Sequence, residues 1–234
     1  MSETVDVLAI GAHPDDVELG CGGTLVKLKE QGHSVAILDL TRGELGSRGT
    51  PEQRLAEAAE ATRILGVQRL ENMALADGHI VADTETRIRL IRILRHYRPR
   101  LVITHDGWGH PDHYQVHRLV VEASHHAGLC KVDTHQARHR PEKLAYWIEY
   151  TQPTLPDVVV DITSSWETKE SAIRAYGSQL YRDGSEEPET YLSRTDFLDQ
   201  IRSQNRQAGN LAACDFGEAY RLSRRARPAD LLEC

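Results

Sequence analysis

The strongest constraint on the fold lies at the start of the chain, where two short apolar runs flank one helical segment. Residues 5–12 are mostly apolar, small or β-branched and end in a polar turn, a pattern typical of a parallel strand that is buried on both faces. Residues 20–32 place apolar side chains at helical spacing, and residues 34–40 are again apolar. A strand, a helix and a second strand in this order predict the beginning of a parallel sheet.

The same alternation continues along the chain. The clearest helix is predicted over residues 51–65, with Thr50 as its N-cap, Pro51 in its first position and Gly66 as its stop. Further helices are predicted over 84–97, 111–127, 165–176 and 197–208, strands over 101–104, 144–150 and 158–162, and a long polar loop over 177–195. No repeat or linker divides the chain. We therefore expect an α/β fold in a single domain over residues 1–234, with a Rossmann-like, mostly parallel sheet flanked by helices and a C-terminal extension of strands and helices.

The composition excludes several classes of protein. With 28 Lys and Arg against 35 Asp and Glu, the formal net charge is −7, whereas proteins that bind nucleic acid usually carry clustered positive charge. No apolar run reaches the ~20 residues needed to cross a bilayer, and the first residues lack the basic and apolar regions of a secretion signal. The widely spaced cysteines fit neither a disulfide framework nor a thiolate zinc site. We expect a cytoplasmic protein with free thiols and with no nucleic-acid or membrane partner.

One basic stretch, residues 87–100, could instead indicate a membrane-surface or RNA-binding helix. Its arginines alternate with an ordinary apolar stripe. We therefore interpret them as a solvated or subunit-contacting face, and the same interpretation applies to Arg224, Arg225 and Arg227.

Histidines are concentrated in the middle of the chain, where nine of the 12 lie between His96 and His139. Two motifs stand out: His-Pro-Asp-Asp at residues 13–16 follows the first strand, and His-Pro-Asp-His at residues 110–113 follows the strand over 101–104. Ligands of parallel sheets bind at the carboxyl ends of the strands, so the two motifs can meet in one crevice. A catalytic zinc takes three protein ligands from imidazole and carboxylate groups. Either motif alone is equally expected as a turn and helix start, but the pair favours a metal site.

These motifs belong to a wider resemblance. The chain resembles the zinc-dependent N-acetylglucosaminyl deacetylases of the LmbE and PIG-L family in residues 12–18, 20–23, 41–44 and 110–113 and in Arg54 with Glu57. It departs from the usual His-Pro-Asp-Asp-Glu pattern because Val17 precedes Glu18, which touches none of the implied ligands. More narrowly, the chain is similar to the deacetylases of bacillithiol biosynthesis in Lys169 and in residues 140–141, 146–147, 159–163, 175–179 and 216–220.

The resemblance implies a role for each residue of the two motifs. His13, Asp16 and His113 become the ligands of one zinc per chain, for which other divalent metals could substitute. Asp15 becomes the base beside the metal, and a protonated His110 becomes the partner that stabilises the oxyanion. Either of these two groups could protonate the leaving amine. Asp112 could orient a ligand imidazole, or it could serve only as a helix-start carboxylate.

Substrate contacts follow from the same resemblance, and each has a structural alternative. Arg54 and Arg140 could bind a carboxylate or sugar hydroxyls, although Arg54 could instead pair with Glu57. Trp108 could cover a sugar face or belong to the core. Tyr191 could donate its hydroxyl to the oxyanion or only anchor its loop. We expect His117, one helical turn after His113, to lie outside the ligand set because the intervening Glu of H-E-x-x-H is missing.

The activity that the resemblance implies is removal of acetate from an N-acetylglucosaminyl compound, most narrowly the malate glycoside on the route to bacillithiol. It further implies a small-molecule substrate and a homo-oligomer, such as the hexamer of related enzymes. A deacetylase of other N-acetylglucosamine derivatives and a thiol-conjugate amidase would use the same metal ligands. A Rossmann-like nucleotide-binding protein is a weaker alternative, because the glycine spacing differs from G-x-G-x-x-G and the motif at 13–16 carries two carboxylates.

Overall fold

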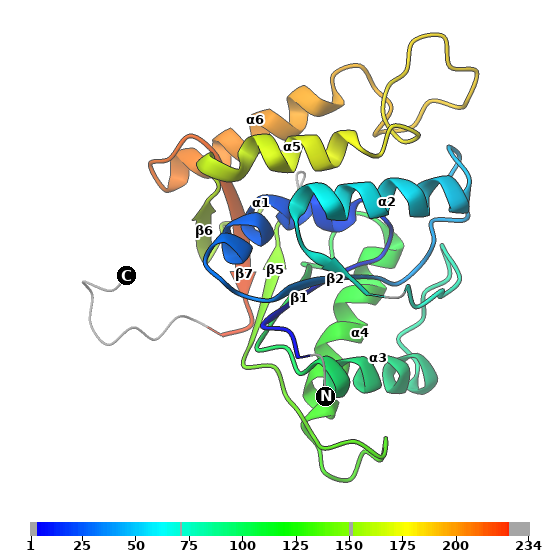
Figure 1. Cartoon of the computed structure of the whole chain (residues 1–234), viewed down its shortest axis with the longest axis vertical. Helices are drawn as coiled ribbons and strands as arrows, with labels where there is room; N and C mark the ends of the chain where they lie inside the picture. Colours follow the sequence, from blue (N-terminus) through cyan, green and yellow to red (C-terminus); the bar gives the residue numbers. More distant parts are fainter. Residues whose placement is uncertain (1–3, 71, 150–151, 225–234) are drawn as a thin grey trace.

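The computed structural model describes residues 4–70, 72–149 and 152–224. Their strands form one seven-stranded sheet in the order β3-β2-β1-β4-β5-β7-β6 (Figure 1). Its parallel part consists of β1 (Val7–Gly11), β2 (Val35–Asp39), β3 (Gln68–Arg69), β4 (Leu101–His105) and β5 (Lys143–Trp147). Its antiparallel part consists of β7 (Gly217–Leu222) and β6 (Val158–Asp161). The predicted α/β class, with its mostly parallel sheet and C-terminal extension, is confirmed.

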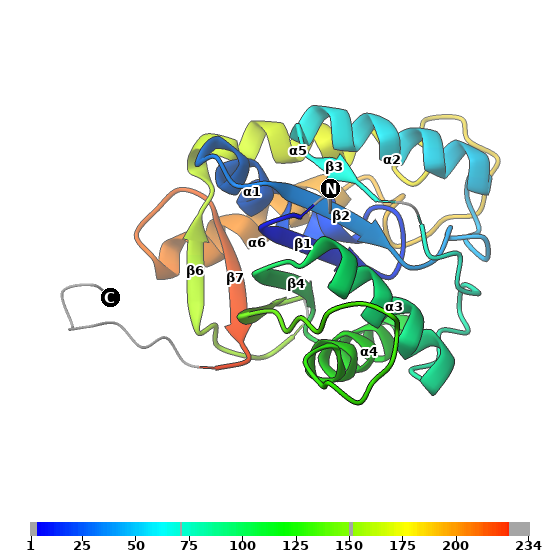
Figure 2. The same ribbon diagram turned by 60° about the horizontal axis from the view of Figure 1, so that its bottom comes forward.

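Helices cover both faces of the sheet (Figures 1 and 2). One face carries α1 (Asp16–Glu30), α2 (Pro51–Leu65) and α5 (Trp166–Arg174), the last preceded by the short 3-10 helix η1 (Thr163–Ser165). The other face carries α3 (Thr84–Tyr97) and α4 (Pro111–Ala127). The last helix, α6 (Phe197–Leu211), packs beside the antiparallel strands.

Strand β1 shows why its sequence is apolar throughout. Leu8 and Ile10 pack into the core beneath α3 and α4, while Val7 and Ala9 pack into the core beneath α1 and α2. All of these side chains are buried, as expected for a parallel strand between two helical layers. The buried central strand predicted from the sequence is therefore present.

Local signals placed the ends of α2 correctly but not the start of α1. Thr50 Oγ1 accepts a hydrogen bond from Gln53 N at 3.2 Å, and Gly66 ends α2 with φ of 68°. By contrast, α1 begins at Asp16 rather than at Gly20. Glycine disfavours a helix interior, but a Cβ on Gly20 would lie 2.6 Å from the Trp147 ring. The glycine therefore permits the helix to approach β5 closely.

Replacement of Gly20 by alanine tests this close approach. We expect Gly20→Ala to lower the free energy of unfolding by about 1–3 kcal/mol, the usual cost of overpacking a core. Gly22→Ala on the same helix is the matched control, because its Cβ would meet its nearest neighbour at 3.5 Å, and a better helix former should leave stability unchanged or raised. Urea denaturation of both variants measures the difference, and equal stabilities would contradict the packing explanation.

The edges of the sheet differ from the sequence prediction. Strand β7 inserts between β5 and β6 and runs antiparallel to both, although residues 217–222 were not predicted as a strand. The two-residue strand β3 was also missed. Strand β5 ends at Trp147, and Tyr150 of the predicted strand lies outside the described residues. These segments are short or lack alternation, so their pairing depends on the neighbouring strands.

A buried ion pair fastens the C-terminal extension to the rest of the fold. Lys169 Nζ on α5 donates to Glu218 Oε1 on β7 at 2.6 Å, and both side chains are buried. Glu218 also accepts the backbone N–H groups of Gly23 at 3.0 Å and Thr24 at 2.8 Å on α1. Because a buried charge must be paired, these contacts fix the positions of α1, α5 and β7 together.

The arginines around α3 do not form one solvated face. Arg95 is buried and donates to the carbonyl oxygens of Ala127, Leu129 and Val132, at 3.0, 2.8 and 2.7 Å. The interpretation of Arg95 as solvated is therefore wrong, because its guanidinium satisfies backbone groups after α4. Arg224 is exposed, and Arg225 and Arg227 lie outside the described residues. Among the described residues, no helix is long and apolar enough to span a membrane.

Candidate metal centre and active site

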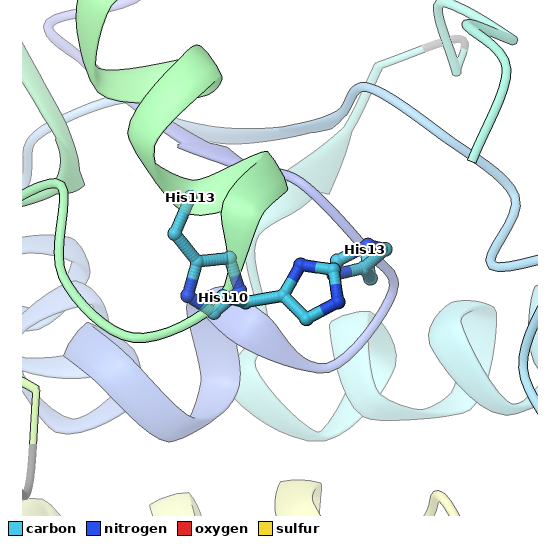
Figure 3. A group of neighbouring side chains, drawn as sticks. All are labelled: His13, His110 and His113. Atoms are coloured by element: carbon cyan, nitrogen blue, oxygen red, sulfur yellow. The ribbon is translucent and has the colours of Figure 1, made fainter. Parts of the chain in front are cut away.

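The two histidine motifs meet at the carboxyl edge of the parallel strands. The turn between β1 and α1 carries His13 and Asp15, Asp16 begins α1, and the start of α4 carries His110 and His113. Figure 3 shows three of these imidazoles gathered together, with the His13 ring centroid 5.1 Å from that of His110 and 5.7 Å from that of His113. The parallel order of β1 and β4 as direct neighbours produces this meeting.

His13 presents its two ring nitrogens to different partners. Nε2 lies 3.0 Å from Asp77 Oδ1 and 3.3 Å from Asp112 Oδ2. Nδ1 lies 3.3 Å from Asp16 Oδ2. Carboxylates beside a ring nitrogen hold the proton there and leave the other nitrogen as a ligand. A proton held at Nε2 would leave Nδ1, which faces Asp16, as the metal-binding nitrogen of His13.

Two further histidines approach Asp16, and their ring nitrogens differ in their other contacts. His105 Nε2 lies 3.3 Å from Asp16 Oδ2 but accepts the backbone N–H of Ala12 at 3.2 Å. His113 Nε2 lies 3.4 Å from Asp16 Oδ1, while its Nδ1 lies 2.6 Å from Glu149 Oε1. Nε2 of His105 therefore already accepts a hydrogen bond, whereas Nε2 of His113 would become a metal ligand beside Asp16 once its proton is lost.

The electrostatics of the cluster suit a bound cation. Burial lowers the pKa of His113, but Asp16 and Glu149 outweigh this effect and raise the pKa to about 10. Burial also lowers the pKa of His13, but Asp16, Asp112 and Asp77 outweigh this effect and raise the pKa well above its ordinary value. Donor atoms of His13, His110 and His113, and separately of Asp16, His105 and His113, lie within 4.8 Å of one another. Imidazole and carboxylate groups at this spacing fit zinc.

Asp15 lies beside the cluster on a strained backbone. Its φ is 115°, a conformation that side chains other than glycine rarely adopt. Burial raises the pKa of Asp15 to about 7, although Arg54 opposes the shift. Arg54 Nη2 donates to Asp15 Oδ2 at 3.2 Å and to Pro14 O at 2.6 Å. Arg54 therefore holds Asp15 rather than Glu57, which instead accepts two hydrogen bonds from Ser178.

His110 is the N-cap of α4 and faces the cluster from the side of that helix. Its Nδ1 accepts the backbone N–H of Asp112 at 3.2 Å, so this nitrogen carries no proton. Burial lowers the pKa of His110, and the nearby His13 and His113 lower it further. A neutral ring with its proton on Nε2 fits both observations, whereas the sequence predicted a protonated His110.

A cavity of about 910 Å³ opens beside these groups, within the range of small-molecule sites. It continues from the histidine cluster along α6 and β7. Arg54 and Tyr191 line it. The Tyr191 hydroxyl donates to Gln200 Oε1 at 3.0 Å, so this phenol also anchors its own loop. Trp108 is half-buried in the loop between β4 and α4, outside the set of lining residues.

Arg140 does not reach the cavity, so its expected position is wrong. Its Nη2 donates to the carbonyl oxygen of His125 near the end of α4 at 3.0 Å. It precedes β5 and therefore lies at the amino end of the parallel strands, opposite the metal cluster.

His117 Nδ1 lies 2.9 Å from the carbonyl oxygen of His105, and its ring packs on Tyr146 rather than entering the cluster.

Sequence reasoning missed three residues of the cluster: Asp77, His105 and Glu149. His105 ends β4 and Glu149 follows β5, so the position of each at a strand's carboxyl end was a usable signal. Asp77 lies in an irregular segment before α3 and accepts the backbone N–H of Leu45 at 2.8 Å. No strand or motif marks it, and only the folded chain places it beside His13.

A family model described as GlcNAc-PI de-N-acetylase, PIG-L, matches residues 8–124 of this chain. The chain belongs to the PIG-L family. The matched residues include both histidine motifs, and the membership predicted from the sequence is confirmed. Its relatives include deacetylases, enzymes that hydrolyse an amide, and this chain is a deacetylase as well.

Individual relatives agree with the PIG-L assignment over most of the chain. The diacetylchitobiose deacetylase of Thermococcus kodakarensis is 34% identical over 200 residues, which cover 80% of this chain and 74% of the relative. A deacetylase of 1D-myo-inositol 2-acetamido-2-deoxy-alpha-D-glucopyranoside from a Mycobacterium species is 29% identical, over 77% of this chain and 76% of the relative. The crystal structure of a conserved protein from Thermus thermophilus matches with a TM-score of 0.88 and 36% identity, over 97% of this chain and 99% of that one.

Proposed function

We propose that this PIG-L protein is a zinc-dependent deacetylase that hydrolyses the N-acetyl group of an N-acetylglucosaminyl compound. The observation that carries the proposal is the position of His13 Nδ1 and His113 Nε2 beside the two carboxylate oxygens of Asp16, next to the buried carboxyl group of Asp15. Family relatives that act on acetylated aminosugars support the substrate class.

His13, Asp16 and His113 would hold one metal ion per chain, with zinc as the preferred ion and other divalent metals as substitutes. Asp77 and Asp112 orient His13, and Glu149 orients His113, through the ring nitrogens that face away from Asp16. Such partners of ligand imidazoles fix the ring and raise its basicity. A bound zinc would polarise the acetyl carbonyl and lower the pKa of a bound water.

Asp15 and His110 carry the proton transfers and the charge stabilisation. The Asp15 carboxylate accepts a proton from the attacking water and returns it to the departing amine, and a pKa near 7 suits both steps. Arg54 fixes the position of this carboxylate. His110 donates its Nε2 proton in a hydrogen bond to the oxyanion of the tetrahedral intermediate. Loss of one such donor typically costs about 2.7–4 kcal/mol.

The narrower substrate that we propose is N-acetylglucosaminyl malate. Its support is the resemblance of C-terminal segments to deacetylases of bacillithiol biosynthesis, because those segments contribute Trp147, Lys169, Gln179 and Glu218 to the cavity wall. Tyr191 at the rim of the cavity and Trp108 near the cluster remain candidates for contacts with the sugar. Other N-acetylglucosamine derivatives and thiol-conjugated amides fit the same metal ligands.

A substrate panel tests the proposal. We expect acetate release from N-acetylglucosaminyl malate with kcat/KM at least about tenfold above that for diacetylchitobiose and free N-acetylglucosamine, since binding energy from the aglycone adds to transition-state stabilisation. Removal of metal with a chelator should abolish release, and added zinc should restore it. Faster turnover of diacetylchitobiose would overturn the malate assignment alone, whereas release that persists after verified metal removal would overturn the metal mechanism.

We further propose that residues 1–234 act as one domain in a cytoplasmic homo-oligomer, such as a hexamer. The single sheet shared by the described residues supports the first part, and the family resemblance supports the second.

A further inference from the structure

The loop between α5 and α6, residues 175–196, contains no helix or strand. Irregular segments of this length are uncommon in compact domains and are usually either functional loops, such as binding loops, or linkers. This loop contributes Gln179, Thr190, Tyr191 and Leu192 to the wall of the cavity. The conformation of this loop therefore decides the shape of the substrate site, although the loop lacks the regular backbone hydrogen bonds of a helix or a sheet.

One buried guanidinium organises this loop. Arg48, from the segment between β2 and α2, is only 4% exposed. Its Nε donates to Ser178 O at 3.0 Å, its Nη1 to Pro188 O at 3.1 Å and its Nη2 to Leu180 O at 3.3 Å. Nη2 also lies 3.4 Å from Glu187 Oε2. A single side chain thus gathers carbonyl groups from both ends of the 178–188 segment.

Side chains of the loop also form hydrogen bonds with the backbone of Arg48 and Gly49. Gln179 Nε2 donates to Arg48 O at 2.8 Å, and Gly49 N donates to Glu187 Oε1 at 3.1 Å. Gly49 has φ of 68°, and a Cβ there would lie 2.7 Å from Ser178 Oγ. The two segments therefore approach each other too closely for a side chain to lie between them.

We propose that Arg48 is a positioning residue that holds the 175–196 loop against the cavity and thereby sets the affinity for the sugar substrate. Arg48 itself does not line the cavity, so it acts through the loop and not on the reacting groups. A guanidinium presents its donors in a rigid planar fork, whereas an ammonium group is a compact point charge. Lysine at this position keeps the charge but cannot reach all of these carbonyl groups together.

Limited trypsin digestion tests the loop without reference to activity. Arg182 lies exposed in the loop and becomes cleavable when the loop opens. We expect Arg48→Lys to raise the rate of cleavage after Arg182 at least about tenfold under native conditions, because opening no longer breaks the full set of hydrogen bonds. Arg63→Lys is the matched control, since Arg63 is exposed on α2 and pairs with Glu60. An unchanged cleavage rate in folded Arg48→Lys would overturn the proposal.

Kinetics test the link to substrate and rest on the proposed deacetylase activity. With the N-acetylglucosaminide that the wild type turns over best, we expect Arg48→Lys to raise KM about five- to tenfold and to change kcat less than about twofold, as for loss of uniform binding. A fall in kcat with unchanged KM would overturn the positioning role. Glu187→Ala replaces an exposed residue, so it provides a test even if Arg48→Lys does not fold. We expect it to raise KM by a smaller factor and likewise to leave kcat nearly unchanged. Because the digestion needs no substrate, a wrong substrate assignment would leave its result intact.

Discussion

Asp15→Asn should lower kcat by about 100- to 10,000-fold, the range expected when a positioned general base is lost. The amide cannot accept the proton of the attacking water, yet it keeps the size of the carboxyl group. Asparagine also tolerates positive φ better than most residues, so the backbone at φ of 115° is preserved. Acetate release measured by a coupled assay and metal content measured on the same sample give the two required readings.

The metal content separates the role of Asp15 from that of its neighbour. We expect Asp15→Asn to retain its metal, whereas the control variant Asp16→Asn should lose much of it, because Asp16 lies between His13 and His113. Full activity in Asp15→Asn would remove Asp15 as the base. Loss of metal from Asp15→Asn would instead make Asp15 a ligand.

His13→Ala should weaken metal binding by more than about 100-fold, because loss of even an outer partner of a ligand costs about 10- to 100-fold. His13 is also the imidazole on which Asp77 and Asp112 converge. Its removal therefore leaves two carboxylates without their shared partner as well as a missing ligand. Metal analysis after dialysis against a competing chelator, with acetate release on the same sample, measures the effect.

His117→Ala is the matched control on the helix that carries His113. Its Nδ1 faces the His105 carbonyl oxygen at 2.9 Å, so its removal should leave the metal content unchanged. Asp77→Asn should fall between the two, because it weakens the orientation of His13 without removing a ligand. Equal metal loss in His13→Ala and His117→Ala would require a different ligand set.

Local sequence patterns were sufficient for the elements whose signals are short-range. The buried strand β1 and the capped helix α2 follow from apolar runs, a Thr-Pro start and a glycine stop. The start of α1 was misplaced because the close contact between Gly20 and Trp147 spans much of the chain. Strand β7 was missed for the same kind of reason, since its pairing partners come from β5 and β6.

The candidate site divides in the same way. His13, Asp15, Asp16, His110 and His113 are predictable because each motif follows a strand, and neighbouring parallel strands end at one edge. Asp77 could not be predicted, because a loop before α3 brings it to His13. Arg140 was placed wrongly because it precedes β5 and therefore lies at the amino ends of the parallel strands, away from the site.

By itself, the sequence determined the parallel sheet, the PIG-L family and the chemical types gathered at the site, since these depend on residue order and local spacing. Only the tertiary structure decided which partner each ring nitrogen of the histidines faces. Ala12 N–H occupies Nε2 of His105, whereas carboxylates face the outer nitrogens of His13 and His113. It also decided that Arg54 holds Asp15 and that Arg48 holds the 175–196 loop. These contacts join residues far apart in the chain, and the folded geometry alone sets their distances and directions.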